Sequence, residues 1–210
     1  MRKISFCLIV FLGSLASILT AQNLVPLQNP DEFLAKLKES SKNTQTLQAD
    51  FTEEKFLSYL KEPQKSTGVF YYKKENMLRW EKIKPTPYIL IIQGNQVKLK
   101  ENGKEVDVSS FNQMMGKIKE LMISLINGDF HKSKAFVPRY FSDSKFYVVN
   151  LIPKSSRLAK VFDHIQLTFY KDNLLLKELT FFEKSGDKSV MRFYNDKVNE
   201  SLSNTLFTDF

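Results

Sequence analysis

The sequence predicts an α+β protein built on one antiparallel sheet of roughly eight to eleven strands, with helices covering one face of that sheet. Most segments after residue 46 are short, rich in aromatic and β-branched residues, and bounded by turn residues, whereas only two segments show helical spacing. The 18 Phe and 8 Tyr, set against only 7 Gly and 7 Pro, favour a β-rich core over a collagen-like or disordered chain. A sheet of this size tends to curl, and a helix across its mouth would enclose an apolar volume.

The first 21 residues are predicted to be a secretory signal peptide. Arg2 and Lys3 precede an uncharged apolar run over residues 4–19, and small Ala21 stands where cleavage would occur. The run is short for a membrane-spanning helix, which argues against the alternative of an uncleaved anchor. The sequence therefore predicts export.

Residues 22–210 are expected to form a single mature domain. Cys7 lies inside the apolar run, where it cannot become a lipid-bearing first residue, so the protein is not itself expected to be lipidated. Cleavage removes this only cysteine, which excludes disulfides and thiolate metal sites from the mature chain. It also lowers the formal charge from +8 to +6, because Arg2 and Lys3 are lost.

The first mature element is predicted to be an amphipathic helix. Asn29 is expected to be its N-cap, with Pro30 at the first helical position and acidic Asp31 and Glu32 in the first turn. Its apolar side is formed by Phe33, Leu34 and Leu37.

From Leu47 onward the pattern changes to alternation, with Leu47, Ala49 and Phe51 on one face of a strand. Turn residues separate eight further expected strands, at residues 67–73, 77–83, 88–93, 96–101, 145–152, 164–170, 174–183 and 189–195. A terminal segment, residues 204–210, is expected to close the sheet.

A second helix is predicted over residues 111–126, behind a cap at Ser109 and Ser110 and before Gly128. Its wide apolar stripe comprises Phe111, Met114, Met115, Ile118, Leu121, Met122, Leu125 and Ile126. Methionine suits a surface that must accommodate varying apolar shapes. On the residues alone, core packing is the preferred interpretation of this stripe, and a ligand-facing lid remains open as the alternative.

The sequence offers no catalytic or metal-binding pattern. His131 and His164 have no short ligand spacing, which excludes the common metal motifs. Asp163 and His164 lack a nucleophile-elbow serine, and the glycines form no phosphate-binding loop. The basic residues are spread among acidic neighbours and form no stripe, which argues against a nucleic-acid partner.

Several stretches in order along the chain resemble the LolA family of periplasmic outer-membrane lipoprotein carriers. Residues 47–55 (LQADFTEEK), 68–81 (GVFYYKKENMLRWE) and the pair Lys84-Pro85 are similar to the family's N-terminal signature. The later stretches similar to its closing strands are residues 165–167, 183–187 and 199–207.

The resemblance implies a half-open β-barrel closed by a helical lid over an apolar cavity. The cavity would hold the acyl chains of lipoproteins, taken from an inner-membrane lipoprotein-releasing transporter and delivered to an outer-membrane acceptor, without enzymatic activity or cofactor. A monomer is expected. The residues assigned to this cavity are Phe51, Phe70, Tyr72, Leu78, Trp80, Ile89, Ile91, Met114, Met115, Ile118, Leu121 and Met122.

Lys74 stands where many members of the family carry an arginine that ties the lid shut, and Glu75 replaces the proline that usually follows. A lysine can bond lid carbonyls only as a point charge, without the forked geometry of a guanidinium. Lys74 is therefore the expected lid latch, with a solvated turn lysine as the alternative.

Two other functions remain open on the same scaffold. One is an envelope sensor or assembly module that binds a protein partner and fills the cavity with its own side chains. The other is a carrier of a different apolar lipid or a pigment.

Overall fold

The computed structural model of the chain describes residues 24–94, 96–108 and 120–210. The predicted signal peptide over residues 1–21 lies outside the described residues. So do Met114, Met115 and Ile118 of the second predicted helix.

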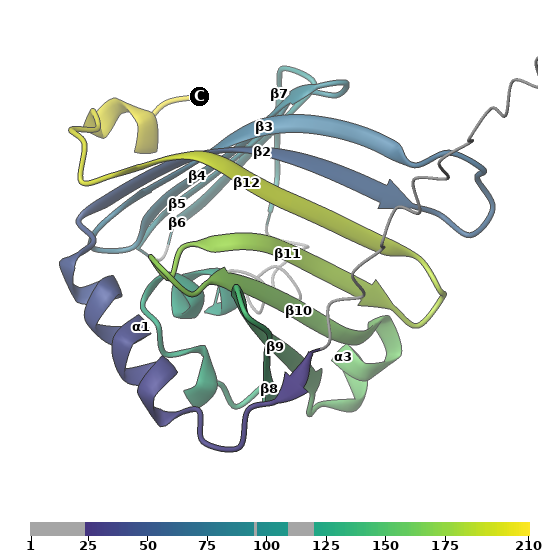
Figure 1. Cartoon of the computed structure of the whole chain (residues 1–210). Coiled ribbons are helices and arrows are strands. Elements are labelled where there is room, and N and C mark those ends of the chain that lie inside the picture. The colour runs from purple at the N-terminus through teal and green to yellow at the C-terminus, as the bar shows by residue number, and fades with distance from the viewer. Residues whose placement is uncertain (1–23, 95, 109–119) are drawn as a thin grey trace, which may run out of the picture.

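The described residues form one twelve-stranded antiparallel sheet in the order β1-β8-β9-β10-β11-β12-β2-β3-β4-β5-β6-β7. The sheet curves from β2 to β7 on one side round to β8 and β9 on the other and stays open, as Figure 1 shows. The strands are β1 (Val25–Pro26), β2 (Thr46–Phe56), β3 (Gln64–Lys73), β4 (Met77–Lys84), β5 (Tyr88–Gln93), β6 (Gln96–Glu101), β7 (Lys104–Val106), β8 (Phe136–Ser142), β9 (Phe146–Pro153), β10 (Phe162–Tyr170), β11 (Leu176–Glu183) and β12 (Lys188–Val198).

The predicted incurved antiparallel sheet is thus confirmed, but it has more strands than expected. β1 and β7 are too short to leave a pattern in the sequence. β8 carries Pro138, which normally argues against a strand. Proline is tolerated here because β1 pairs only with the end of β8, at Phe141 and Ser142. The missing N–H of Pro138 therefore leaves no carbonyl of β1 without a donor.

Helices occupy the concave side of the sheet. The helix α1 (Asp31–Asn43) begins one residue later than predicted, and the Asn29 side chain accepts a hydrogen bond of 2.9 Å from the Asp31 N–H. The ring of Phe33 packs 4.4 Å from that of Tyr147 and 5.7 Å from that of Phe169, which fixes α1 against β9 and β10. Residues 120–126 are also helical, and the short helix α3 (Ser156–Val161) follows β9.

The C-terminal segment does not close the sheet as predicted. Residues Asn204–Phe207 form the 3₁₀ helix η3, which lies outside the sheet and contacts β4 and β5 (Figure 1). Arg79 donates hydrogen bonds to the carbonyls of Leu206 and Asp209, at 3.2 and 2.8 Å. The backbone of this segment therefore bonds side chains of the sheet instead of a neighbouring strand.

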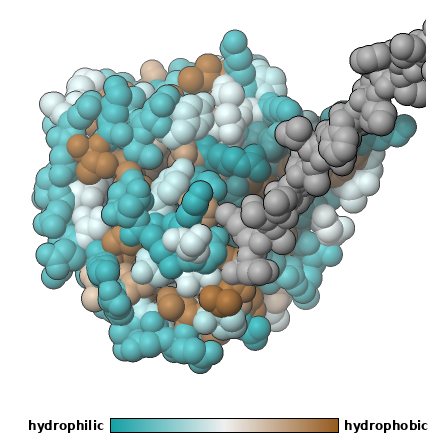
Figure 2. All heavy atoms as spheres, in the orientation of Figure 1, coloured by the Kyte–Doolittle hydropathy of each residue, from teal (hydrophilic) through white to brown (hydrophobic). Residues whose placement is uncertain are grey.

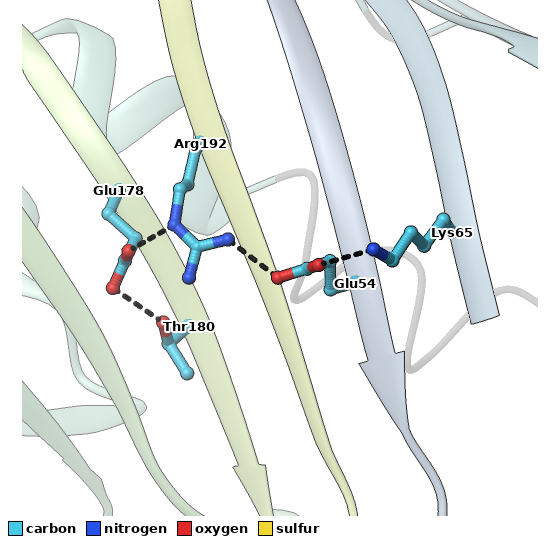
Figure 3. A network of polar contacts seen from close by, with 5 residues as sticks. All are labelled: Glu54, Lys65, Glu178, Thr180 and Arg192. Atoms are coloured by element: carbon cyan, nitrogen blue, oxygen red, sulfur yellow. Dashed lines mark hydrogen bonds and ion pairs between the residues drawn. The ribbon is translucent and has the colours of Figure 1, made fainter. Parts of the chain in front are cut away.

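The two faces of the sheet differ in chemistry because alternate side chains point to opposite faces. The concave face carries the main apolar core. On the convex face four strands are joined by a polar network, drawn in Figure 3, in which Glu54 contacts Lys65 at 3.5 Å and Arg192 at 2.8 Å. Arg192 also contacts Glu178 at 3.1 Å, and Thr180 donates to the same carboxylate at 3.2 Å.

The outer surface is mainly hydrophilic on the face shown in Figure 2, with hydrophobic residues in scattered groups. Within the described ranges, no helix has both the length and the hydropathy needed to cross a bilayer.

Candidate functional site

The concave wall of β2–β4 brings together the aromatic residues predicted to line a cavity. Phe70 is paired with Trp80 across β3 and β4, and Phe51 lies on the same face of β2. The Trp80 ring lies 4.9 Å from that of Phe51 and 5.7 Å from that of Phe70. Phe193 of β12 completes the group at 6.2 Å from Trp80, although the sequence analysis did not select it.

Tyr72 and Leu78 are paired on the same face and are buried in the same core. Burial raises the pKa of the Tyr72 phenol, so this side chain stays neutral and contributes an apolar ring to the wall.

Ile89 and Ile91 do not face the cavity as predicted. Ile89 is paired with Glu81, and Ile91 with Arg79, so both lie on the convex face. Their neighbour Ile92, paired with Leu78, takes the concave position. The apolar residues of β5 are consecutive, so the sequence does not show which of them face the cavity. The convex face of β5 is apolar as well because η3 covers part of it and buries Ile91 there.

Helical residues 120–126 supply the described part of the predicted lid. Leu121, Met122 and Leu125 are buried within the core, so this end of the helix packs onto the concave face.

An apolar cleft of about 100 Å³ lies between the helices and the sheet. It is bounded by α1, residues 120–126, the start of β2 and the turn before β11. The residues that line it are Leu37, Ser40, Ser41, Thr44, Leu47, Ala49, Phe70, Met122, Leu125, Ile126, Phe169, Leu174, Leu175, Leu176, Phe193 and Asp196.

Lys74 is exposed and fastens α1 to the sheet. Its ammonium donates a hydrogen bond of 2.9 Å to the carbonyl of Lys42 in the last turn of the helix. The backbone N–H of Lys74 donates to the carbonyl of Gln45 at 2.8 Å. Lys74 therefore joins the sheet to α1 and makes no such bond to residues 120–126.

The end of helical residues 120–126 is held by α1 itself. The Lys38 ammonium and the Ser41 hydroxyl both donate to the carbonyl of Asn127, at 3.0 and 2.9 Å. Gly128 follows with a φ of +65°, and a Cβ there would come within 3.0 Å of the Leu37 carbonyl oxygen. Lys74, α1 and the Asn127 carbonyl therefore form a series of contacts from the sheet to the second helix.

Polar groups gather at one rim of the cleft. Ser40, Ser41 and Thr44 come from the end of α1, and Asp196, which lines the same cleft, comes from β12. Burial raises the pKa of the Asp196 carboxyl above its ordinary value of 3.8. No motif in the sequence marked Asp196, because only the folded sheet brings it to the cleft.

A second, polar recess of about 420 Å³ lies on the same face, beyond the aromatic group. Its floor includes the largely buried carboxylate of Glu53, which contacts Lys82 at 2.6 Å and accepts a hydrogen bond from Ser66 at 2.8 Å. Across the described ranges, no group of three or more His, Cys, Asp or Glu side chains is arranged to hold a metal ion.

Comparison with known proteins matches residues 42–209 to the family described as outer membrane lipoprotein carrier protein LolA. An outer-membrane lipoprotein carrier protein of Coxiella burnetii (strain CbuK_Q154) is 28% identical over 201 residues, which span 94% of this chain and 88% of that protein. One from Dechloromonas aromatica (strain RCB) is 25% identical over 185 residues, or 88% and 86% of the two chains. A solved LolA superfamily protein from Nitrosomonas europaea superposes with a TM-score of 0.44 at 14% identity, covering 88% of this chain and 98% of that one.

Proposed function

The chain belongs to the LolA family of outer membrane lipoprotein carrier proteins, and from this premise we propose that it binds the acyl chains of lipoproteins in the cleft beneath α1. It carries them through the periplasm from the inner to the outer membrane.

The observation that carries this proposal is the apolar cleft on the concave face. Each CH₂ group removed from water contributes roughly 0.8 kcal/mol, so an acyl chain cannot cross an aqueous compartment without a shield. Leu47, Phe70, Met122 and Phe193 provide apolar surface from three strands and a helix around one space.

Uptake of an acyl chain requires the cleft to widen. Its volume of about 100 Å³ is below the roughly 300–1,000 Å³ typical of sites that enclose small ligands. We infer that α1 and residues 120–126 move away from the sheet when cargo enters. These helices also pack on the core, but the hydrogen bonds from Lys74, Lys38 and Ser41 at their ends support this inference, because such contacts can break and re-form at modest cost.

The same proposal includes the compartment and the partners. Residues 1–21 direct export and are removed, an inner-membrane transporter donates the lipoprotein, and an outer-membrane acceptor receives it. The carrier acts as a monomeric binding protein and needs no cofactor for this step.

Copurification with a lipoprotein tests the proposal. The full chain is expressed with a tagged lipoprotein in a Gram-negative host, the periplasmic fraction is released, and the two proteins are isolated together. Extraction and mass spectrometry of the bound fraction then identify any acyl chain or pigment. We expect acylated lipoprotein to copurify with the wild-type chain.

Two leucine substitutions sharpen the test. Leu175→Glu places a charge in the cleft, where Leu175 is partly buried, whereas Leu60→Glu changes an exposed leucine of the β2–β3 loop. We expect only Leu175→Glu to abolish copurification while thermal unfolding shows that both variants fold. Recovery of ligand-free wild-type protein, or of a non-acylated partner that Leu175→Glu still binds, contradicts the proposal.

A further inference from the structure

Asp196 reaches the cleft because of an irregularity in β12. The pairing of β12 with β2 shifts between Tyr194 and Lys197, and Asn195 adopts a φ of +56°. A bulge of this kind changes the direction of a side chain within an otherwise regular strand, and such bulges are common beside functional sites. Here it places a carboxylate among the apolar residues that line the cleft.

The end of α1 adds further hydrogen-bond acceptors to the cleft. Ser40, Ser41 and Thr44 line the same cleft as Asp196, and a helix C-terminus carries a partial negative charge. The Ser41 hydroxyl donates to the Asn127 carbonyl and the Thr44 hydroxyl donates to the Ser40 carbonyl at 3.0 Å, so their protons are already used. Both hydroxyl oxygens can still accept hydrogen bonds.

The neighbouring cations are directed elsewhere. Lys38 bonds the Asn127 carbonyl, Lys74 bonds the Lys42 carbonyl, and Lys197 lies 4.0 Å from Glu200. None of these three lysines lines the cleft. The rim therefore presents a partly desolvated carboxylate and several acceptors beside an apolar space.

We propose that Asp196 and the end of α1 form a headgroup site that selects acyl ligands carrying a primary ammonium group. The acyl chain occupies the cleft and the ammonium donates to the Asp196 carboxylate. The inference rests on the proposed function and deepens it, because it names a chemical class of cargo. The free α-ammonium of a lipid-bearing N-terminal cysteine has this chemistry, and so does an ethanolamine lipid headgroup.

The net positive charge of the chain works against binding of an ammonium group. The formal net charge of +6 that remains once Arg2 and Lys3 are removed repels a cationic ligand at long range. A preference for an ammonium head over an uncharged head must therefore arise locally.

The test compares decylamine with decanol, which share a ten-carbon chain and differ in the head. Binding is followed below the micellar concentration by the fluorescence of Trp80, the only tryptophan, whose ring packs against Phe70 and Phe193 of the cleft. We expect the wild-type protein to bind decylamine roughly tenfold more tightly, as for a hydrogen bond to a charged group. Asp196→Asn should remove this preference, and the control Glu62→Gln, at an exposed loop residue, should keep it.

Equal affinity for the two ligands, or an unchanged preference in Asp196→Asn, overturns the headgroup site while leaving acyl binding intact. Failure of both ligands to bind contradicts the proposed function itself. The two outcomes are therefore distinguishable.

A second set of ligands identifies the source of the ammonium. The probes are a dipalmitoylated cysteine peptide with a free amine, the same peptide with its amine palmitoylated, and lysophosphatidylethanolamine. Asp196-dependent preference for the free-amine peptide indicates lipoprotein cargo, and dependence seen only with the ethanolamine lipid indicates a lipid headgroup. The same affinity of wild type and Asp196→Asn for all three probes overturns the inference.

Discussion

Gly68 shows how one missing side chain allows the aromatic group to form. A Cβ at this position of β3 would lie 2.0 Å from the Glu81 carbonyl oxygen and 2.5 Å from the Phe51 ring. Both distances are far below van der Waals contact, so the Phe51 ring occupies the space that a larger residue would need.

We expect Gly68→Ala to lower the free energy of unfolding by at least about 3 kcal/mol, the upper end of the range for overpacking. Urea unfolding followed by Trp80 fluorescence measures this. Gly186→Ala is the control, because that turn glycine has a φ of +91° but no atom within 4 Å of an added Cβ. It should cost only about 1–2 kcal/mol. A larger loss for Gly186→Ala than for Gly68→Ala would show that space around Gly68 is not limiting.

Asp196 should lower the stability of the ligand-free protein. Burial raises its folded-state pKa above 3.8, so the folded state binds this proton more tightly than the unfolded state does. The free energy of unfolding therefore falls as pH rises from about 3.8 through the raised pKa. Asp196→Asn removes the charge and should stabilise the free protein at pH 7 by about 0.5–1 kcal/mol, within the range of single stabilising substitutions.

Denaturant unfolding at pH 7 and pH 4 tests whether the charge of Asp196 destabilises the ligand-free protein. The advantage of Asp196→Asn should shrink at pH 4, because the raised pKa leaves the wild-type carboxyl protonated to a greater extent there than at pH 7. An advantage of the same size at both values would mean that the stabilisation does not come from the charge.

At this scale, the alternation of polar and apolar residues in β2 and β4 indicates which residues share a face. Phe51, Phe70 and Trp80, which were assigned to the cavity by the resemblance, lie together on the concave side, and of the three only Phe70 lines the cleft. Ile89 and Ile91 were misplaced because β5 is apolar on both faces. Asp196 could not be found, because its direction depends on a bulge that no local pattern specifies.

Among the elements, Lys74 provides one attachment of α1 to the sheet, beside the packing of Phe33 and the 3.0 Å bond from Asn199 to the Asn43 carbonyl. Lys74→Ala removes the 2.9 Å bond to the Lys42 carbonyl but leaves the core unchanged. We expect a stability loss below about 1 kcal/mol, typical of an exposed contact, together with faster hydrogen exchange of α1 amides. Hydrogen exchange with mass spectrometry measures the second effect.

The adjacent lysine provides a matched control. Lys73 bonds the Leu202 carbonyl and the Asn204 side chain, at 3.1 and 2.6 Å, on the other side of the sheet. Lys73→Ala should therefore speed exchange in the C-terminal segment and leave α1 unchanged. Equal effects of the two variants on α1 would contradict a specific attachment through Lys74.

The C-terminal segment should contribute to stability through Phe207, which is fully buried. We expect Phe207→Ala to cost about 3–5 kcal/mol, as for other buried phenylalanines. Phe210→Ala should cost under about 1 kcal/mol, since that ring is partly exposed and lies 5.3 Å from the Lys100 ammonium. Chemical denaturation of both variants tests the comparison, and similar losses would show that the segment is not anchored by Phe207.

Element prediction was most accurate where turn residues bound a regular strand. The predicted ranges 88–93 and 96–101 coincide with β5 and β6. No strand was predicted at β8, which carries Pro138, and the prediction failed for residues 204–210, whose bonds go to distant side chains such as Arg79. The structure of these two segments depends on contacts between residues that are far apart in the sequence.

For the molecule as a whole, the small cleft implies that cargo uptake is coupled to helix movement. Met122→Ala should widen the cleft, because Met122 is buried and lines it. We expect a loss of about 2–5 kcal/mol in the free energy of unfolding and faster uptake of decylamine or another short acyl ligand. Denaturant unfolding and stopped-flow Trp80 fluorescence measure the two effects.

Met191→Ala is the matched control. Met191 packs against the core from β12 but does not line the cleft. It should lose stability without faster uptake. Equal acceleration by both substitutions would mean that general loosening, and not the width of the cleft, sets the rate.

The incurved sheet and its helical cover could be predicted at this scale because the order of strands and helices limits how the layers pack. The size of the cleft could not, because it depends on how the rings of Phe51, Phe70, Trp80 and Phe193 interlock.

The position of the carboxyl terminus has a practical consequence. Since η3 lies on the convex side of the sheet and α1 on the concave side, a tether fused after Phe210 would leave the chain from the back of the molecule (Figure 1). Protein immobilised on a sensor chip through that end would present its opening to the flowing solution.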